Sequence, residues 1–158
     1  MPIFNRHFFD QEKGIYSPAF LANVGPILDV EVNVPQALMD LSTTQNIPVP
    51  SPITGWALID TGASRTCVDQ AVLSSLMIKP ISTVTMFSAN GQAIHEICPT
   101  KLYFPSLKLS IDFGSVISVN LEGQDILDKP LIVLVGRDIL SNTLFFYNGS
   151  SGLFVFAF

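Results

Sequence analysis

The decisive stretch of this chain reads Trp56-Ala57-Leu58-Ile59-Asp60-Thr61-Gly62-Ala63-Ser64. Its first four residues are apolar and predict a buried strand that ends directly at the carboxylate of Asp60. Thr61 then supplies a hydroxyl, and Gly62 lets the backbone approach the carboxylate closely. A carboxylate in this setting is one half of an acid/base site, because two carboxylates that share one proton are needed to act as base and acid together.

The other half of such a site must come from elsewhere. The sequence contains no second Asp-Thr-Gly or Asp-Ser-Gly. The economical solution is a symmetric pair of chains, each of which gives one Asp60. Taken alone, Asp-Thr-Gly is also a common turn tripeptide. A phosphoryl-transfer loop would require further acidic ligands for Mg²⁺.

A second motif follows further along the chain, where the apolar run Leu131-Ile132-Val133-Leu134-Val135 leads into Gly136-Arg137-Asp138-Ile139-Leu140. Together, the two motifs resemble the two signatures of the retropepsin-like aspartic proteases. In that family the first motif holds the catalytic Asp, and the second is an apolar strand that runs into Gly-Arg-Asn or Gly-x-Asp and a short helix. The resemblance covers roughly residues 27 to 158.

The resemblance implies an all-β, retropepsin-like acid-protease barrel with a flap hairpin and one or two short helices, functional as a homodimer. It implies an aspartic endopeptidase that cleaves peptide or protein substrates by general acid/base activation of a water between two Asp60 carboxylates. No metal or organic cofactor is implied. The resemblance assigns three groups of residues: catalytic Asp60, Thr61 and Gly62; substrate-binding Ala63, Ser64, Ala89, Asn90, Gly91 and Gln92; and structural or dimer-forming Arg137, Asp138, Phe154 and Phe156.

Ser64 departs from the pattern of many viral members, which carry an acidic residue here that pairs with the Arg of the second motif. Arg137 must therefore find another partner, for which we expect Asp69 or Asp138. Ser64 and Asp138 also occur in cellular and bacterial members, so the departure does not remove the resemblance. We expect Arg137 to brace the dimer rather than to act in catalysis.

A hairpin is predicted after the first motif, because residues 84–87 and 93–97 flank Ser88-Ala89-Asn90-Gly91-Gln92. Asn-Gly is a strong signal for a tight turn, since both residues tolerate positive φ. In a retropepsin-like protein, a hairpin at this distance after the catalytic loop looks like the flap that closes over substrate. An ordinary hairpin with no gating role is the alternative.

The rest of the chain predicts short strands and loops. Residues 1–26 show no clear periodicity and predict an irregular N-terminal extension, which could be removable or inhibitory, ahead of a protease domain at 27–158. The other expected elements are a half-exposed strand at 27–34, a Pro-rich surface loop at 41–55, a helix capped by Asp69 that runs to 76, strands at 101–104, 107–113, 116–121 and 131–135, a short helix at 138–142, and a last hairpin of 144–147 and 153–158. Phe154, Phe156 and Phe158 share one face of the final strand, which places them in the core or in a seam between subunits.

Composition limits the function. The chain is 48% hydrophobic and only 13% charged, and its mean hydropathy of +0.45 predicts that part of its apolar surface is hidden in a partner. A net charge of -5 without a Lys/Arg cluster argues against a nucleic-acid ligand. We expect no membrane span and no secretory signal, so the expected compartment is the cytoplasm.

Other candidate groups carry less information. Cys67 and Cys98 are expected to be buried thiols, and neither has the spacing of a zinc site. His7 and His95 lie far apart in the sequence, and Ser64 lacks the elbow motif of a hydrolase nucleophile, so none of the three is assigned a catalytic role. From another functional class, a catalytically silent retropepsin-fold module for peptide binding or dimerisation is the alternative.

Overall fold

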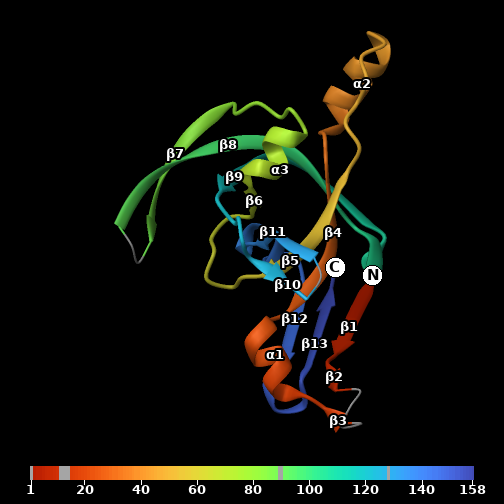
Figure 1. Ribbon diagram of the computed structural model, residues 1–158, viewed down its shortest axis with the longest axis vertical. Coiled ribbons are helices and arrows are strands. Elements are labelled where there is room, and N and C mark those ends of the chain that lie inside the picture. Colours follow the sequence, from red (N-terminus) through yellow and green to blue (C-terminus); the bar gives the residue numbers. More distant parts are fainter. Residues whose placement is uncertain (1, 11–14, 89–90, 128) are drawn as a thin grey trace.

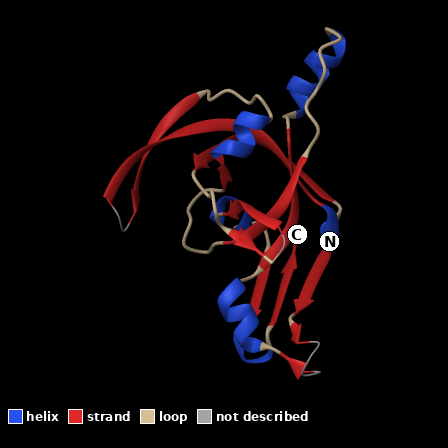
Figure 2. Cartoon of the chain, in the orientation of Figure 1, coloured by secondary structure: helices blue, strands red, loops and turns tan. Residues whose placement is uncertain are grey.

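The computed structural model describes residues 2–10, 15–88, 91–127 and 129–158 of the chain. About half of the chain is strand, and the helices are short (Figure 2). The all-β class predicted from the sequence is confirmed. The strands are β1 (Ile3–His7), β2 (Phe9–Asp10), β3 (Ile15–Tyr16), β4 (Ile27–Asn33), β5 (Ile53–Ile59), β6 (Cys67–Asp69), β7 (Ser82–Ser88), β8 (Gly91–Phe104), β9 (Leu109–Val119), β10 (Asp125–Ile126), β11 (Lys129–Val135), β12 (Leu144–Asn148) and β13 (Leu153–Ala157).

Six strands of the largest sheet close into a barrel. Hydrogen-bonded neighbours follow the order β11-β5-β4-β8-β9-β6, and β6 pairs in turn with β11, which closes the ring. β10 and β7 pair with β11 and β8 outside this ring. Figure 1 shows β7 and β8 extending from the barrel as a long, curved arm. Closure pairs the strands on both sides, so the barrel can carry irregular loops at its ends without exposing free edges.

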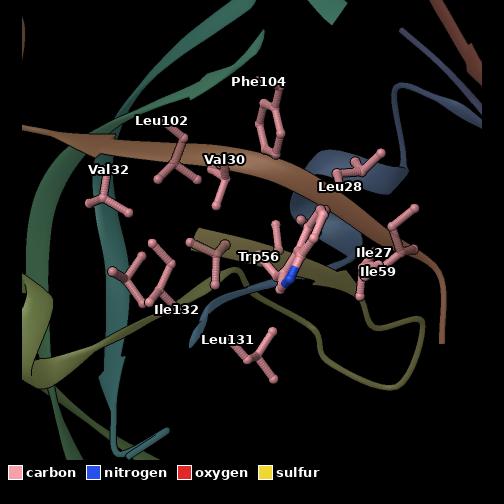
Figure 3. Close-up of a cluster of buried hydrophobic side chains, with 14 of the residues drawn as sticks. Ile27, Leu28, Val30, Val32, Trp56, Ile59, Leu102, Phe104, Leu131 and Ile132 are labelled. Atoms are coloured by element: carbon pink, nitrogen blue, oxygen red, sulfur yellow. The ribbon is translucent and has the colours of Figure 1, made fainter. Parts of the chain in front are cut away.

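Alternating side chains fill the barrel. In β4, Val30 and Val32 are buried while Asp29 and Glu31 are only half-buried, which confirms the period-2 pattern expected for this strand. Figure 3 shows part of the resulting core, to which β4, β5, β8 and β11 contribute Ile27, Leu28, Val30, Val32, Trp56, Ile59, Leu102, Phe104, Leu131 and Ile132. The strands that lead to both sequence motifs are therefore fixed by burial of their apolar side chains.

The N-terminal residues are part of the folded body, so the expectation of an irregular extension is wrong. β1 pairs antiparallel with β13 over its whole length, from Ile3↔Ala157 to His7↔Leu153. β13 is the central strand of a three-stranded sheet with the order β1-β13-β12. The sequence hides this strand because Arg6 occupies an inward position, which breaks the apolar alternation of β1.

Arg6 is held where β1 meets the barrel. Its guanidinium lies 4.9 Å from the ring centroid of Trp56 and 3.5 Å from the carboxylate of Asp29. Lys129 repeats the arrangement, at 4.7 Å from the Trp56 ring and 2.9 Å from Asp29. Trp56 Nε1 also donates to Ile126 O at 2.9 Å. Two cations, one carboxylate and one indole thus connect the N-terminal strand to β4, β5 and β11.

In the part of the chain that the structure describes, four short α-helices accompany the strands: α1 (Pro18–Val24), α2 (Gln36–Thr44), α3 (Gln70–Ser75) and α4 (Arg137–Leu140). The sequence predicts α3 and α4, but it predicts neither α1 nor α2. α1 carries clear end signals, since Pro18 opens it and Gly25 closes it at φ +81°. None of the helices in the described ranges is long and apolar enough to cross a membrane.

The surface loop expected at 41–55 is shorter in the structure. α2 continues to Thr44 and β5 begins at Ile53, so the connecting segment is 45–52, which contains the three prolines. α2 has no buried residue, and Figure 1 shows it projecting from the barrel. Because α2 is short and buries no side chain, its sequence gives no strong signal for a helix, and it was not expected.

Leu21→Ala tests whether α1 belongs to the folded core. Leu21 is 0% exposed, so we expect the substitution to lower the free energy of unfolding by about 2–4 kcal/mol through a cavity. The matched control is Leu38→Ala on α2, where Leu38 is 41% exposed and the loss should stay below about 1 kcal/mol. Urea unfolding at equal protein concentration measures both. Similar losses in the two variants would contradict a core role for α1.

Candidate active site

Two parallel strands bring the two sequence motifs together. β5 and β11 are parallel, and Ile59 stands opposite Val135 at their carboxyl ends. Because parallel neighbours end at the same edge of a sheet, the loops that start at Asp60 and Gly136 begin side by side. The Asp60 N–H donates to Val135 O at 3.0 Å, which extends the strand pairing to the carboxylate-bearing residue itself.

The loop from Asp60 to Thr66 then crosses the end of β11. On the far side the chain returns as β6, which pairs antiparallel with β11. Gly136 lies at the crossing, where an added Cβ would stand 2.3 Å from the carbonyl carbon of Arg65 and 2.7 Å from Thr66 N. Only glycine permits two backbones to approach so closely.

A buried threonine connects the two loops. The Thr66 hydroxyl donates to Asp138 Oδ1 at 2.7 Å and accepts the Gly136 N–H at 3.2 Å. The Thr66 N–H donates to Asp138 Oδ2 at 2.8 Å. Asp138 Oδ1 also accepts the Ile139 N–H at 2.9 Å, in the first turn of α4. Asp138 therefore links the loops within one chain, and both of its oxygens are used in doing so.

The Asp60 carboxylate is half-buried and is held through one oxygen. Oδ1 accepts the N–H groups of Gly62 at 2.9 Å and Ala63 at 3.2 Å. Within the described ranges no residue donates a hydrogen bond to Oδ2. Gly62 leaves little room here, since an added Cβ would lie 3.1 Å from Oδ1. One oxygen is thus fixed, and the other can bond to a water, a substrate or a second carboxyl group.

Arg137 satisfies three consecutive carbonyls of the Asp60 loop. Its Nη1 donates to Thr61 O at 2.8 Å and to Gly62 O at 3.0 Å. Its backbone N–H donates to Ala63 O at 3.0 Å. The expectation that Arg137 pairs with Asp69 or Asp138 is therefore wrong, because backbone carbonyls take the place of a carboxylate.

Asp69 is occupied by a different task, which the sequence did predict. Its Oδ1 accepts the N–H groups of Ala71 at 2.8 Å and Val72 at 3.3 Å, which confirms it as the N-cap of α3. Its Oδ2 accepts the Leu121 N–H at 2.7 Å. The Asp69 side chain thus caps α3 and also attaches the segment after β9 to the start of this helix.

The predicted hairpin is confirmed. β7 and β8 pair from Ser82↔Ile97 to Ser88↔Gly91. Gly91, at φ +110°, is the first residue of β8 rather than part of the turn, and Gln92 stands opposite Phe87. Ala89 and Asn90 lie outside the described residues. The structure thus gathers the predicted loop residues Asp60 to Ser64 with Arg137 and Asp138, whereas Gly91 and Gln92 stand at the end of the hairpin arm (Figure 1).

Phe154 and Phe156 lie in the core of the single chain. They are 0% and 1% exposed, and the Phe154 ring contacts those of Phe4 and Phe145, with centroids 5.9 and 6.4 Å apart. Their side chains are therefore not available to a seam between subunits. Phe158, at the end of the same strand face, is half-buried.

The two cysteines are buried free thiols, as expected. Burial raises the pKa of Cys67 to about 11, with further contributions from the carboxylates of Asp138 and Asp60. Burial also raises the pKa of Cys98, with a smaller contribution from Glu96. A protonated thiol is a weak nucleophile.

Thr66 and Arg65 stabilise the Asp60 loop, and neither was predicted from the sequence to do so. Thr66 is fully buried, and Arg65 donates from Nη2 to the Ser115 hydroxyl at 2.6 Å and to Ser115 O at 3.2 Å. Arg65 thereby attaches the loop to β9. A hydroxyl residue directly before a buried strand was the available signal for Thr66, while nothing in the sequence marks Ser115 as a partner.

Gly136→Ala tests the close approach of the two loops. An added methyl cannot fit 2.3 Å from the Arg65 backbone, so we expect the free energy of unfolding to fall by about 2–4 kcal/mol. Gly114→Ala is the matched control, because a Cβ on Gly114 meets nothing within 4 Å. Chemical denaturation measures both variants. A Gly136 variant as stable as the Gly114 variant would show that the loops do not pack as described.

No family model matches the sequence, and no curated protein matches it. Among solved structures, the chain is similar to a retropepsin-like aspartic protease from Rickettsia conorii, with 13% identity, 99% of this chain and 92% of that chain covered and a TM-score of 0.46. It is also similar to the simian foamy virus (mac) protease, with 16% identity, coverage of 73% and 92% and a TM-score of 0.42. A third match is the retroviral protease-like domain of Ddi1 from Leishmania major, with 15% identity, coverage of 77% and 81% and a TM-score of 0.39.

Two of these structures are a retropepsin-like protease and a retroviral protease-like domain, and the third is a viral protease. The present chain has the all-β architecture with a closed six-stranded barrel and few short helices.

Proposed function

We propose that the chain is a homodimeric aspartic endopeptidase whose active site forms between two copies of Asp60. The observation that carries the proposal is the half-satisfied carboxylate, with Oδ1 held by two N–H groups and no donor to Oδ2 among the described residues. One carboxylate cannot be base and acid at the same moment. Two that share a proton can, because the like charges oppose a second ionisation.

In the proposed reaction a water lies between the two Asp60 carboxyl groups. The ionised carboxylate takes a proton from the water as its oxygen attacks the peptide carbonyl carbon. The protonated carboxyl group donates a hydrogen bond to the carbonyl oxygen, on which negative charge develops. The carboxyl group that took the proton of the water then gives it to the leaving nitrogen as the C–N bond breaks, which yields a carboxylic acid and an amine and returns the two carboxyl groups to their starting state. Gly62 would present its backbone to an extended substrate.

The surface around Thr61 supports a contact with a second copy. Thr61 is exposed beside the carboxylate, and its hydroxyl would bond across the two-fold axis. An apolar hollow next to it is lined by Thr61, Arg137, Leu140, Ser141 and Phe145. A chain with mean hydropathy +0.45 gains stability when such a surface is covered.

The β7–β8 arm is proposed to act as the flap. Its pairs alternate between two faces, so Phe87 and Ile94 share one face and Val84 and Met86 share the other. Phe87 and Ile94 are 80% and 74% exposed, while Val84 and Met86 are half-buried. Ala63, Ser64, Gly91 and Gln92, with Ala89 and Asn90 at the tip, would contact the substrate between loop and arm.

Asp60→Asn tests the catalytic assignment. The substitution keeps the shape of the side chain but removes the charge, so we expect peptidase activity at acid pH to fall at least about a thousand-fold. Asp40→Asn on α2 is the matched control and should retain activity, since Asp40 only accepts a bond from Gln36 on the exposed helix surface. A fluorescent protein substrate measures cleavage, with a pepstatin-like inhibitor as a second probe.

The outcome of this test also separates the alternative function. A silent peptide-binding module would show no acid-range cleavage and no inhibition in the wild-type protein. Cleavage that persists in the Asp60→Asn protein would assign the activity to another residue.

The dimer is tested by sedimentation over a range of protein concentrations. We expect a monomer–dimer equilibrium, and we expect specific activity to fall on dilution in step with the dimer. Thr61→Asp should shift the equilibrium toward monomer, because two like charges would face each other at the axis. Monomer mass at every concentration, together with undiminished activity, would contradict the two-chain site.

A further inference from the structure

We infer that Arg137 acts on Asp60 through two intervening peptide groups, as a positioning residue that strengthens the hydrogen bonds to the carboxylate. Its significance for catalysis rests on the proposed function, whereas the contacts themselves do not. Arg137 was expected from the sequence to brace a dimer. Within its own chain, its guanidinium bonds to the loop that carries Asp60.

The two peptide groups bridge the guanidinium and the carboxylate. In the peptide between Thr61 and Gly62, the carbonyl accepts from Arg137 Nη1 at 2.8 Å and the N–H donates to Asp60 Oδ1 at 2.9 Å. In the peptide between Gly62 and Ala63, the carbonyl accepts from the same Nη1 at 3.0 Å and the N–H donates to the same Oδ1 at 3.2 Å. Two parallel chains of hydrogen bonds thus start at one nitrogen and reach one oxygen, although the Ala63 N–H also donates to the backbone Asp60 O at 3.2 Å.

Such chains polarise their members. A cation at a peptide oxygen draws electron density toward that oxygen and makes the N–H of the same peptide group a stronger donor. Hydrogen bonds in series strengthen one another by roughly 10–30% per bond. Donors that are strengthened in this way favour the charged form of the carboxylate that accepts them. Arg137 therefore supports negative charge on Oδ1 without a direct ion pair.

Neighbouring charged groups do not offer an equivalent route. Arg65, on the same loop, directs its guanidinium to Ser115 on β9. Asp138 on α4 accepts from Thr66 and Ile139. Cys67 on β6, whose pKa is raised to about 11, is uncharged in the acid and neutral range. Arg137 is exposed, so water screens its field through space, but the direct contact with the two carbonyls is preserved.

The consequence concerns the pH range of the site. The base in the proposed reaction must be ionised, so support for the charge on Oδ1 extends function toward lower pH. Loss of the Arg137 charge should move the acid limb of the activity profile to higher pH. A residue that merely held the loop in place would lower stability or the overall rate and leave the position of the acid limb unchanged.

The test compares Arg137→Gln, Arg137→Lys and Arg65→Gln in the full-length protein. Amide ¹H–¹⁵N spectra recorded across the acid range follow Gly62 and Ala63, whose N–H groups report on the carboxylate that they contact. This readout needs no peptidase activity. The pH profile of kcat/KM is the second readout, and thermal unfolding checks that each variant is folded. Arg137→Met replaces Arg137→Gln should the latter fail to fold.

In Arg137→Gln we expect the Gly62 and Ala63 amide protons to move upfield at neutral pH, and the midpoint of their acid transition to move to higher pH. Arg137→Lys keeps the charge and should move the midpoint less. Arg65→Gln removes a nearby charge outside the relay and should leave the midpoint close to the wild-type value.

The inference is overturned if Arg137→Gln leaves the amide transition in place, or if Arg65→Gln moves it equally far. The two readouts also distinguish this inference from the proposed function. Expected amide shifts in a protein without peptidase activity would uphold the relay and reject the endopeptidase, and the reverse result would reject the relay alone.

Discussion

The parallel pairing of β5 with β11 is the constraint on which the site depends. It sets Ile59 opposite Val135, and the next residue, Asp60, continues the ladder with a bond to Val135 O. A shift by one residue would turn every side chain of β5 to the opposite face, so burial of the barrel core fixes the register strongly. The hydrophobic effect therefore places the carboxylate, although the carboxylate itself contributes nothing to the core.

The Asp60 loop is anchored from its buried side and left open on the other. Thr66 is fully buried and Gly136 lies against the backbone of Arg65 and Thr66, whereas Thr61, Gly62 and Ser64 are exposed. A buried hydrogen bond contributes about 1 kcal/mol when it is made and costs more when one partner is lost. Anchoring below the loop thus makes it rigid without covering the carboxylate, which is the combination that a preorganised site requires.

Much of this arrangement could be predicted from the sequence, and the failures have a physical origin. Residue types in the sequence predict three of its features: the apolar run that ends at Asp60, the helix cap at Asp69 and the hairpin around Asn90-Gly91. They do not predict the partner of Arg137, because backbone carbonyls are present at every residue and leave no pattern. β1 was missed for a related reason, since its inward cation is neutralised by Asp29, which is distant in sequence.

The closure of the barrel also lies beyond the reach of local patterns. β6 has only three residues, yet it pairs with β11 on one side and β9 on the other, and this short strand completes the ring. The pairing of β6 depends on the position at which the Asp60 loop ends, because a strand of three residues has too little periodicity to predict it. Site and fold are therefore coupled, because the loop that carries the carboxylate is also the connection that closes the barrel.

The terminal sheet limits how two copies can meet. β13 is central, with β1 and β12 hydrogen-bonded on its two sides, so its backbone has no free edge to offer to a partner. Within the described ranges the outer edge of β12 is unpaired, and this strand exposes Leu144 and Phe146 at 57% and 49%. The same strand contributes Phe145 to the apolar hollow beside Thr61. In the proposed dimer, a contact over the Thr61 surface would bury the apolar hollow to which Phe145 contributes and bring two Asp60 carboxylates together, whereas Leu144 and Phe146 point to the other face of β12.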